Sequence, residues 1–495
     1  MRSSGVLMHI SSLPSPYGIG TMGKEAKQFV DFLVDGSLSY WQVLPLGPTG
    51  YGDSPYQSFS AYAGNPYFID LESLIEEKIL TEKECESYDW GEHVDKVDFG
   101  ILYENRYQLL KKGFLRFKEN IPADYQEFCE KEEEWLNDYA LFMAIKDQKD
   151  GLAWSKWDDD IKFRKESALQ AANEKLSDEV FFYKMLQYYF YKQWTELKNY
   201  ANKKGIQIIG DIPIYVAEDS ADVWANPTQF YLDDNLDPID VAGCPPDGFS
   251  KDGQLWGNPL FRWDKMKEDG YEWWVKRIAG IRKLFDVVRI DHFRGFDSYY
   301  SIPYGNINAK IGEWREGPGI ELFQEIEKKL GKLNIIVEDL GFLTDSVRKM
   351  VADSGFPGMK LMQFAFDSRD DGDYLPHNFI KHSVVYTGTH DNDTILGWME
   401  TAPTESALFA VEYLRLTKEE GYHWGMMKSA WASVSDLAIV TMQDLLGLDS
   451  EARMNTPSTL GCNWMWRMKE GNLTKELAKK IHYNMEMYGR LAIKK

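Results

Sequence analysis

Apolar residues recur along this chain in short, nearly continuous runs that end in polar and usually acidic residues. Such runs, rather than alternating apolar and polar positions, are typical of strands buried on both faces, as in parallel sheets. Eight of them are present, at residues 5–10, 40–46, 206–213, 286–292, 334–341, 359–366, 383–391 and 437–444. Helical patterns lie between most of the runs. The pattern predicts an α/β protein built on a (β/α)8 TIM barrel.

Two intervals between the runs are longer than a crossover helix requires. We predict an inserted, mostly helical subdomain over residues 47–200, with the catalytic barrel formed by residues 1–46 and 201–495. Residues 217–280 are rich in Asp, Pro, Gly and Trp, which predicts a loop-rich insertion over the cleft at the barrel mouth. A doubly wound open sheet is the weaker alternative, because no glycine-rich phosphate-binding motif follows an early run.

The charge and aromatic content narrow the range of ligands. The net charge of −22 argues against a nucleic acid or an anionic membrane as partner, since both require basic patches. The chain has 17 Trp and 28 Tyr, and most of these rings are expected to fill the core. The surplus still allows a site in which flat rings stack on the apolar faces of sugars.

The cysteines and the N-terminus indicate where the protein works. Four scattered cysteines form neither a zinc pattern nor a disulfide framework, so free thiols in a reducing compartment are expected. The first residues hold too short an apolar run for a signal peptide, and no segment reaches the length of a membrane span. We predict a cytoplasmic protein without a cofactor.

Acidic residues close several of the predicted strands. They are Asp211, Asp291, Glu338 or its neighbour Asp339, and Asp391. One acidic strand end is usually a loop start or a helix cap, but a barrel gathers all its carboxyl ends on one face. Four acidic ends at corresponding positions therefore predict a single pocket lined by carboxylates.

Clustered carboxylates serve two common purposes, which are the binding of divalent metals and glycoside chemistry. Arg289 precedes Asp291 by two residues, so both side chains lie on the same face of the strand. A cation there would keep Asp291 ionised and discourage a metal ion, which favours glycoside chemistry. Residues 233–240 could mimic a calcium loop, but they lack the EF-hand spacing, and we predict no metal site.

Several motifs resemble those of a known family. Segments at 210–216, 287–296, 335–341 and 388–394 resemble the catalytic strand ends of the α-amylase superfamily. Longer segments at 11–20, 41–71, 241–261 and 453–464 narrow the resemblance to amylomaltases, the 4-α-glucanotransferases. The resemblance extends from near the first residue to the last few dozen. Unlike many secreted amylases, the chain is expected to have no C-terminal β-sandwich.

The resemblance implies a role for each strand-end residue. Asp291 would be the nucleophile, Glu338 the acid/base with a pKa raised by burial or by nearby anions, and Asp391 the stabiliser of the transition state. Arg289, His390 and Asp211 would position the nucleophile and the donor sugar. Asp339 points to the opposite strand face and is expected to be structural.

The resemblance also implies transfer by double displacement with retention, through a covalent glucosyl-enzyme. An acceptor hydroxyl rather than water would attack the intermediate, so exclusion of water decides the outcome. The candidate sugar contacts are Ser54, Tyr56, Asp247, Phe249, Gln254, Trp256, Phe364 and Asn463. Phe364 could equally fill the barrel core, and Tyr51 resembles a secondary glucan contact on the surface. The expected partners are maltooligosaccharides and α-1,4-glucans.

Two alternatives stay open at this point. An α-glucan hydrolase of the same superfamily would use the same three carboxylates. A non-catalytic glucan-binding protein could share the barrel, because a fold does not dictate a function. The intact Asp291, Glu338 and Asp391 argue against the second alternative.

Overall fold

The computed structural model describes residues 2–246, 251–341, 343–366 and 372–492. Its centre is a closed barrel of parallel strands in the order β1-β12-β11-β10-β9-β6-β3-β2. These are β1 (Ser3–Leu7), β2 (Tyr40–Val43), β3 (Gln207–Ile212), β6 (Val287–Ile290), β9 (Ile335–Val337), β10 (Gly358–Leu361), β11 (Ser383–Tyr386) and β12 (Leu437–Thr441). Each predicted strand coincides with one of them, so the predicted (β/α)8 barrel is confirmed.

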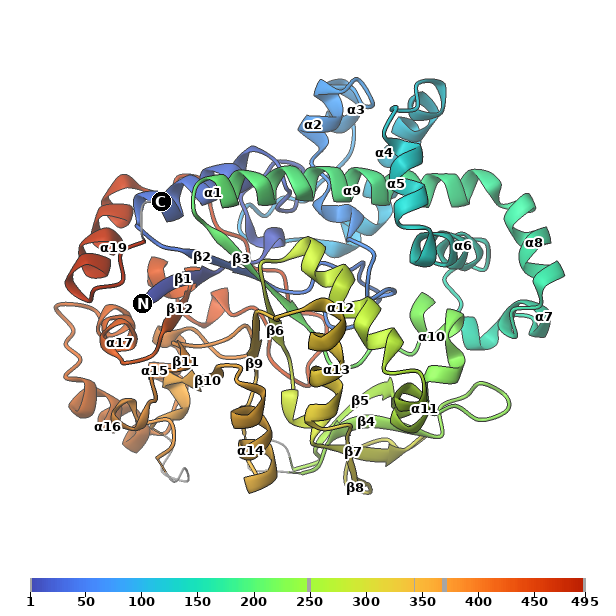
Figure 1. The fold of residues 1–495 in the computed structure, drawn as a ribbon. Helices are drawn as coiled ribbons and strands as arrows, with labels where there is room; N and C mark the ends of the chain where they lie inside the picture. The colour runs from blue at the N-terminus through green and yellow to red at the C-terminus, as the bar shows by residue number, and fades with distance from the viewer. Residues whose placement is uncertain (1, 247–250, 342, 367–371, 493–495) are drawn as a thin grey trace.

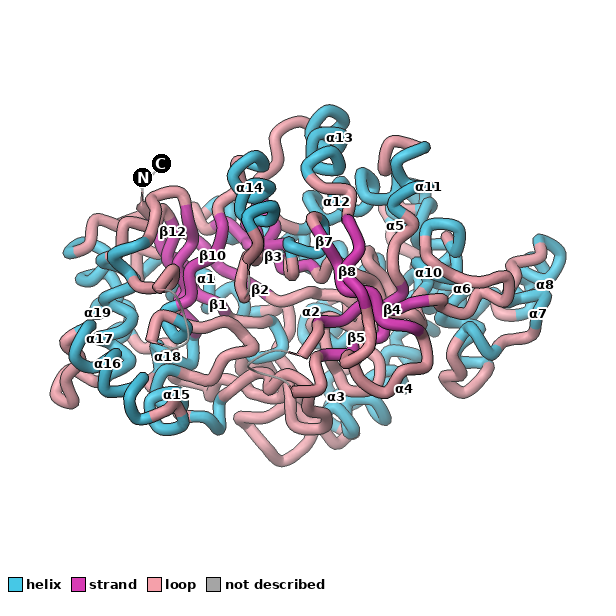
Figure 2. Tube along the Cα trace, turned by 90° about the horizontal axis from the view of Figure 1, so that it is seen from below, coloured by secondary structure: helices cyan, strands magenta, loops and turns pink. Residues whose placement is uncertain are grey.

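Helices surround the barrel strands (Figures 1 and 2). The helices outside the long interval between β2 and β3 are α1 (Lys24–Asp35), α10 (Ala221–Ala225), α11 (Trp263–Glu268), α12 (Glu272–Leu284), α13 (Ile320–Leu330), α14 (Asp345–Ser354), α15 (Ile395–Thr401), α16 (Thr404–Leu414), α17 (Tyr422–Ala432), α18 (Met442–Leu446) and α19 (Lys475–Met487). Strands β11 and β12 are buried along their whole length, which explains their continuous apolar runs. None of the helices in the described ranges combines the length and apolar character that crossing a bilayer requires.

The interval between β2 and β3 is mostly helical. It contains α2 (Leu71–Glu76), α3 (Glu82–Glu86), α4 (Phe99–Glu119), α5 (Tyr125–Lys131), α6 (Glu133–Gln148), α7 (Asp159–Lys162), α8 (Glu166–Lys175) and α9 (Ser177–Lys203). Helix α9 is long and runs along one side of the barrel (Figure 1), where it contacts β3, α1 and α12. Its Trp194 indole donates a hydrogen bond to the Leu284 carbonyl at 2.9 Å. The division into a subdomain over residues 47–200 stays a prediction.

Residues 217–280, which we predicted to be rich in loops, also contain helices and strands. Besides α10, α11 and α12 they supply β4 (Asp240–Cys244) and β5 (Gln254–Pro259). These pair with β7 (Ser298–Pro303) and β8 (Glu313–Glu316) in an antiparallel sheet of order β5-β4-β7-β8, which lies beside the barrel (Figure 2). The Trp256 ring of β5 meets the His292 ring edge-on at 4.8 Å. Because His292 follows β6 directly, this contact places β5 at the carboxyl end of the barrel.

Gly210 lets β3 pack closely against the end of α12. A Cβ atom at this position would lie 2.0 Å from a ring carbon of Phe285. Phe285 is buried, and its ring contacts the Trp194 ring with centroids 5.8 Å apart. The ring therefore has little room to move away.

We expect Gly210→Ala to lower the free energy of unfolding by about 1–3 kcal/mol, because an added methyl group overpacks this contact. Urea denaturation at neutral pH measures the change. The matched control is Gly100→Ala in α4, where the position is exposed and a Cβ would meet only the Asp98 side chain at 3.3 Å. The control should be neutral or stabilising by up to about 1 kcal/mol. Equal stabilities of both variants would contradict this account of Gly210.

Candidate active site

Arg289 lies between two acidic residues at the mouth of the barrel. The pairing of β3 with β6 sets Asp211 beside Arg289. The Nη1 atom of Arg289 lies 2.7 and 2.6 Å from the two carboxylate oxygens of Asp211 and 3.0 Å from Oδ1 of Asp291. The exposed fractions of the Arg289 and Asp211 side chains are 3% and 0%. One buried guanidinium therefore pairs with both carboxylates.

Backbone hydrogen bonds extend the strand pairing to the catalytic candidates. The Asp291 N–H donates to the Ile212 carbonyl at 2.9 Å, and the Glu338 N–H donates to the Ile290 carbonyl at 3.0 Å. The carboxylate of Glu338 accepts the His292 N–H at 2.6 Å. Asp291 and Glu338 are thereby fixed at the ends of adjacent strands.

Burial displaces the pKa values of these two carboxyl groups. Together with the negative charge of Asp291, burial raises the pKa of Glu338 to about 8, while Arg289 and the backbone N–H donors of His292 and Leu340 oppose the increase. Burial also raises the pKa of Asp291 to about 6, although Arg289 opposes the increase. Arg289 thus lowers this pKa, as expected from the sequence, but burial outweighs it. The two shifts favour a proton on Glu338 and a negative charge on Asp291.

Tyr56 links Asp211 to the third carboxylate. Its hydroxyl donates to Asp211 Oδ2 at 2.9 Å and lies 3.3 Å from Nδ1 of His390. Its ring stacks on the His390 ring, with centroids 4.9 Å apart and planes 22° apart. On the far side, Nε2 of His390 lies 3.3 Å from Oδ1 of Asp391, whose side chain is 46% exposed. The structure therefore brings together all three predicted catalytic carboxylates and their three predicted positioning residues.

Several predicted sugar contacts lie around this cluster. The indole N–H of Trp256 donates to Gln254 Oε1 at 3.1 Å. Ser54 accepts the Tyr56 N–H through its Oγ at 3.3 Å. Trp464, which the sequence did not single out, has ring centroids 5.9 Å from Tyr56 and 5.8 Å from His390. The contacts of these side chains with sugar stay predictions.

The remaining candidates differ in their surroundings. Asn463 is buried and uses its amide inside its own loop, where it accepts the Thr456 N–H at 3.0 Å and donates to the Thr459 carbonyl at 2.9 Å. Phe364 meets Tyr374 edge-on at 5.6 Å. Tyr51 is fully exposed, at 102%. Asp247 and Phe249 lie outside the described residues.

Asp339 faces away from the cluster, as the strand period predicts. Its Oδ1 accepts the Met359 N–H at 2.6 Å, which ties the end of β9 to β10. Within the described ranges no group of three or more His, Cys, Asp or Glu side chains is arranged to hold a metal ion. In the candidate calcium loop, Asp233 accepts the N–H groups of Asn235 and Asp237 at 2.8 and 3.0 Å. These hydrogen bonds are typical of a turn stabilised by the side chain of its first residue, Asp233.

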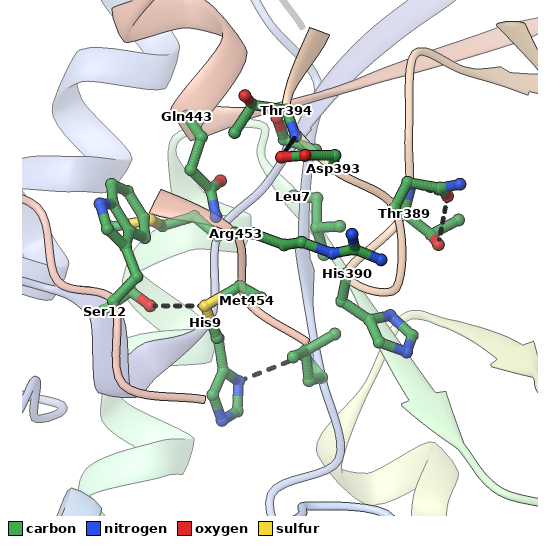
Figure 3. Close-up of a pocket in the computed structure, with 15 residues that line it drawn as sticks. Leu7, His9, Ser12, Thr389, His390, Asp393, Thr394, Gln443, Arg453 and Met454 are labelled. Carbon is green, nitrogen blue, oxygen red and sulfur yellow. Dashed lines mark hydrogen bonds between the residues drawn. The ribbon is translucent and has the colours of Figure 1, made fainter. Parts of the chain in front are cut away.

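A small pocket lies behind His390, at the carboxyl ends of β1, β11 and β12 (Figure 3). Its lining includes His9, Gln443 and Arg453. Burial lowers the pKa of His9 to about 3, and Nδ1 of the neutral ring accepts the Leu44 N–H at 3.3 Å. A neutral imidazole and a guanidinium therefore stand behind the loop that carries His390.

Two residues that contact Asp391 were missed by sequence reasoning. Asn455 donates from its side-chain amide to Asp391 Oδ1 at 2.6 Å, and Arg453 donates from Nη2 to the Asp391 carbonyl at 2.6 Å. Both lie in segment 453–464, which the sequence marked only by its family resemblance. No spacing pattern could have connected them with Asp391, because more than sixty residues separate them.

Comparison with known proteins gives a consistent result over the whole chain. A family model described as 4-alpha-glucanotransferase matches residues 8–474. The 4-alpha-glucanotransferase of Clostridium butyricum is 50% identical over 485 residues, covering 98% of this chain and 100% of the relative. That of Thermus thermophilus is 46% identical over 501 residues and covers 99% of both. The amylomaltase of Streptococcus agalactiae, solved in complex with acarbose, is 44% identical with a TM-score of 0.96 and covers 99% of this chain and 100% of its own.

We expect Glu338→Gln to stabilise the folded protein at pH 8. The ordinary pKa of 4.5 is raised to about 8 in the fold, so between these values only the folded state keeps the proton. Stability therefore falls as pH rises through this window, by up to about 1.4 kcal/mol per pH unit. Glutamine carries no such titration, so the advantage of the variant should grow from pH 5 to pH 8.

Urea denaturation at several pH values measures this difference. Glu400→Gln, which replaces an exposed carboxylate of α15, is the matched control and should show no growing advantage. A constant difference between Glu338→Gln and the parent across the window would contradict the raised pKa of Glu338.

Proposed function

The chain belongs to the 4-alpha-glucanotransferase family, and we propose that it transfers α-1,4-glucan segments by a retaining double displacement. The observation that carries this mechanism is the pair of Asp291 and Glu338 on adjacent strand ends, with pKa values of about 6 and about 8. An ionised nucleophile and a protonated acid at the same pH are what the first chemical step requires.

In the first step Asp291 attacks C1 of the donor sugar while Glu338 protonates the oxygen of the bond that breaks. The reducing-end part of the donor leaves as an alcohol, and the rest stays on Asp291 as a glucosyl ester. Formation of the ester removes the negative charge that raises the pKa of Glu338. That pKa then falls, which prepares the Glu338 carboxylate to act as a base.

In the second step the 4-hydroxyl of an acceptor glucan attacks C1 of the ester. Glu338 takes the hydroxyl proton, the new glycosidic bond forms and the Asp291 carboxylate is released. Two inversions at C1 give net retention. Water would complete the same step as hydrolysis, so acceptor binding and exclusion of water favour transfer.

The neighbouring residues support these steps. Arg289 pairs with Asp291 and opposes the effect of burial on its pKa. We propose that Asp391 and His390 contact hydroxyls of the donor sugar, and that the exposed half of Asp391 gives it access. Tyr56 joins the two sides of the site and offers a ring surface beside His390 for the apolar face of a sugar. Asp211 contributes through Arg289 and Tyr56.

We propose maltooligosaccharides and α-1,4-glucans as the partners that occupy the cleft. The Streptococcus agalactiae amylomaltase was solved in complex with acarbose, which supports an oligosaccharide ligand. A cytoplasmic location is also a proposal, and it agrees with the described cysteines, none of which forms a disulfide.

Incubation with maltotriose tests the function. A transferase should form longer glucans and glucose with little gain in reducing ends, whereas a hydrolase gives only smaller sugars and one new reducing end per event. Chromatographic sizing with a reducing-end assay separates the two outcomes.

Asp291→Asn should lower kcat/KM by at least about 10³-fold while still binding glucan. Wild-type turnover by Asp291→Asn would overturn the mechanism.

We expect a bell-shaped dependence of kcat/KM on pH, with limbs near pH 6 and pH 8. Protonation of Asp291 removes the nucleophile below about 6, and ionisation of Glu338 removes the acid above about 8. A glycosyl fluoride donor needs no acid for its leaving group. With that donor, Glu338→Gln should form the ester without an alkaline limb. A parent rate that keeps rising beyond pH 9 would contradict this assignment.

A further inference from the structure

Segment 453–455 is tied to the loop of Asp391 by a compact set of hydrogen bonds. The Asn455 N–H donates to the His390 carbonyl at 3.0 Å. The Asn455 side-chain amide donates to Asp391 Oδ1 at 2.6 Å. Arg453 donates from Nη2 to the Asp391 carbonyl at 2.6 Å and from Nε to the Asn455 carbonyl at 2.8 Å. The two segments therefore form one hydrogen-bonded unit around Asp391.

These contacts engage only one of the two carboxylate oxygens of Asp391. Oδ1 receives the Asn455 amide and lies 3.3 Å from Nε2 of His390. Within the described ranges no hydrogen-bond donor reaches Oδ2, and the side chain is 46% exposed. A half-exposed aspartate without such contacts would sample several rotamers and lose entropy on binding a ligand. Anchoring Oδ1 fixes the position of Oδ2, whose lone pairs accept no hydrogen bond from the described residues.

Arg453 holds Asn455 in place from behind. Figure 3 shows its side chain crossing the small pocket, with the guanidinium end toward the loop that carries Thr389 and His390. The planar guanidinium bridges the carbonyl groups of Asp391 and Asn455, a geometry that the flexible ammonium of a lysine does not reproduce. Arg453 therefore keeps the Asn455 amide close to its acceptor, the Asp391 carboxylate.

We propose that Asn455, held by Arg453, is a positioning residue that orients the Asp391 carboxylate for the transition state. The inference rests on the proposed function, because it assigns Asn455 an effect only through Asp391. A group that acts in the transition state must be preorganised, since misplacement raises the barrier more than it weakens ground-state binding. Loss of Asn455 should therefore lower kcat more than it changes KM.

Asn455→Ala tests the proposal by steady-state kinetics with maltotriose. We expect kcat to fall by about 10–100-fold, the range typical of residues that orient a functional group, while KM changes by less than about 3-fold. The matched control is Asn472→Ala on the same C-terminal segment, where the Asn472 side chain accepts the Lys469 N–H at 3.0 Å. It should keep the parental kcat. Parental kcat in Asn455→Ala would overturn the proposal.

A double-mutant cycle separates positioning from a general structural role. In an Asp391→Ala background, Asn455→Ala should cost less than about 2-fold in kcat/KM, because the group that it orients is already absent. A glycosyl fluoride donor makes these slow rates measurable. An equal loss in both backgrounds would overturn the proposal.

Asn455→Asp provides a second readout that preserves the shape of the side chain. Its introduced carboxylate replaces the hydrogen-bond donor with an acceptor of like charge, which repels Asp391. We expect Asn455→Asp to lower kcat at least as much as Asn455→Ala does, and parental kcat in Asn455→Asp would overturn the proposal. An active parent with an unaffected Asn455→Ala variant leaves the proposed function standing. If the parent enzyme fails to convert maltotriose into longer glucans, both the proposed function and the role of Asn455 would be overturned.

Discussion

The shared ion pair of Arg289 is the interaction on which the barrel mouth depends. The fully buried Asp211 and the partly buried Asp291 can lie this close together only because the guanidinium lies between them. Removing one partner of such a group leaves an uncompensated charge, at a cost of about 3–5 kcal/mol. The arrangement also requires the observed pairing of β3 with β6, since a shift by one residue would turn one side chain away from the barrel interior.

The same burial that makes the ion pair necessary also supplies the chemistry. It raises the pKa of Glu338 through desolvation and through the nearby charge of Asp291, so one carboxyl keeps its proton while the other is ionised. Arg289, whose Nη1 lies 3.0 Å from Asp291 Oδ1, opposes the increase at Asp291 and so contributes to the difference between the two pKa values. A structural constraint and a division of catalytic roles therefore have one physical cause.

Much of this could be predicted from the sequence. The apolar runs located every barrel strand, and their acidic ends identified Asp211, Asp291, Glu338 and Asp391. The apolar runs and their acidic ends are both local signals, because a few consecutive residues show that a strand is buried on two faces and where it ends. The family resemblance added the activity. The size of each pKa shift was beyond prediction, since it depends on how completely the surrounding residues exclude water.

The sequence by itself determined the barrel, the residues at its strand ends and the family. Tertiary structure alone decided which distant residues complete the site: Tyr56 reaches Asp211, Asn455 reaches Asp391, and Asn463 turns inward to its own loop. It also decided that part of segment 217–280 pairs into a second sheet. These outcomes depend on which loops the closed barrel brings face to face. No local periodicity encodes such contacts, because they join residues far apart in the chain.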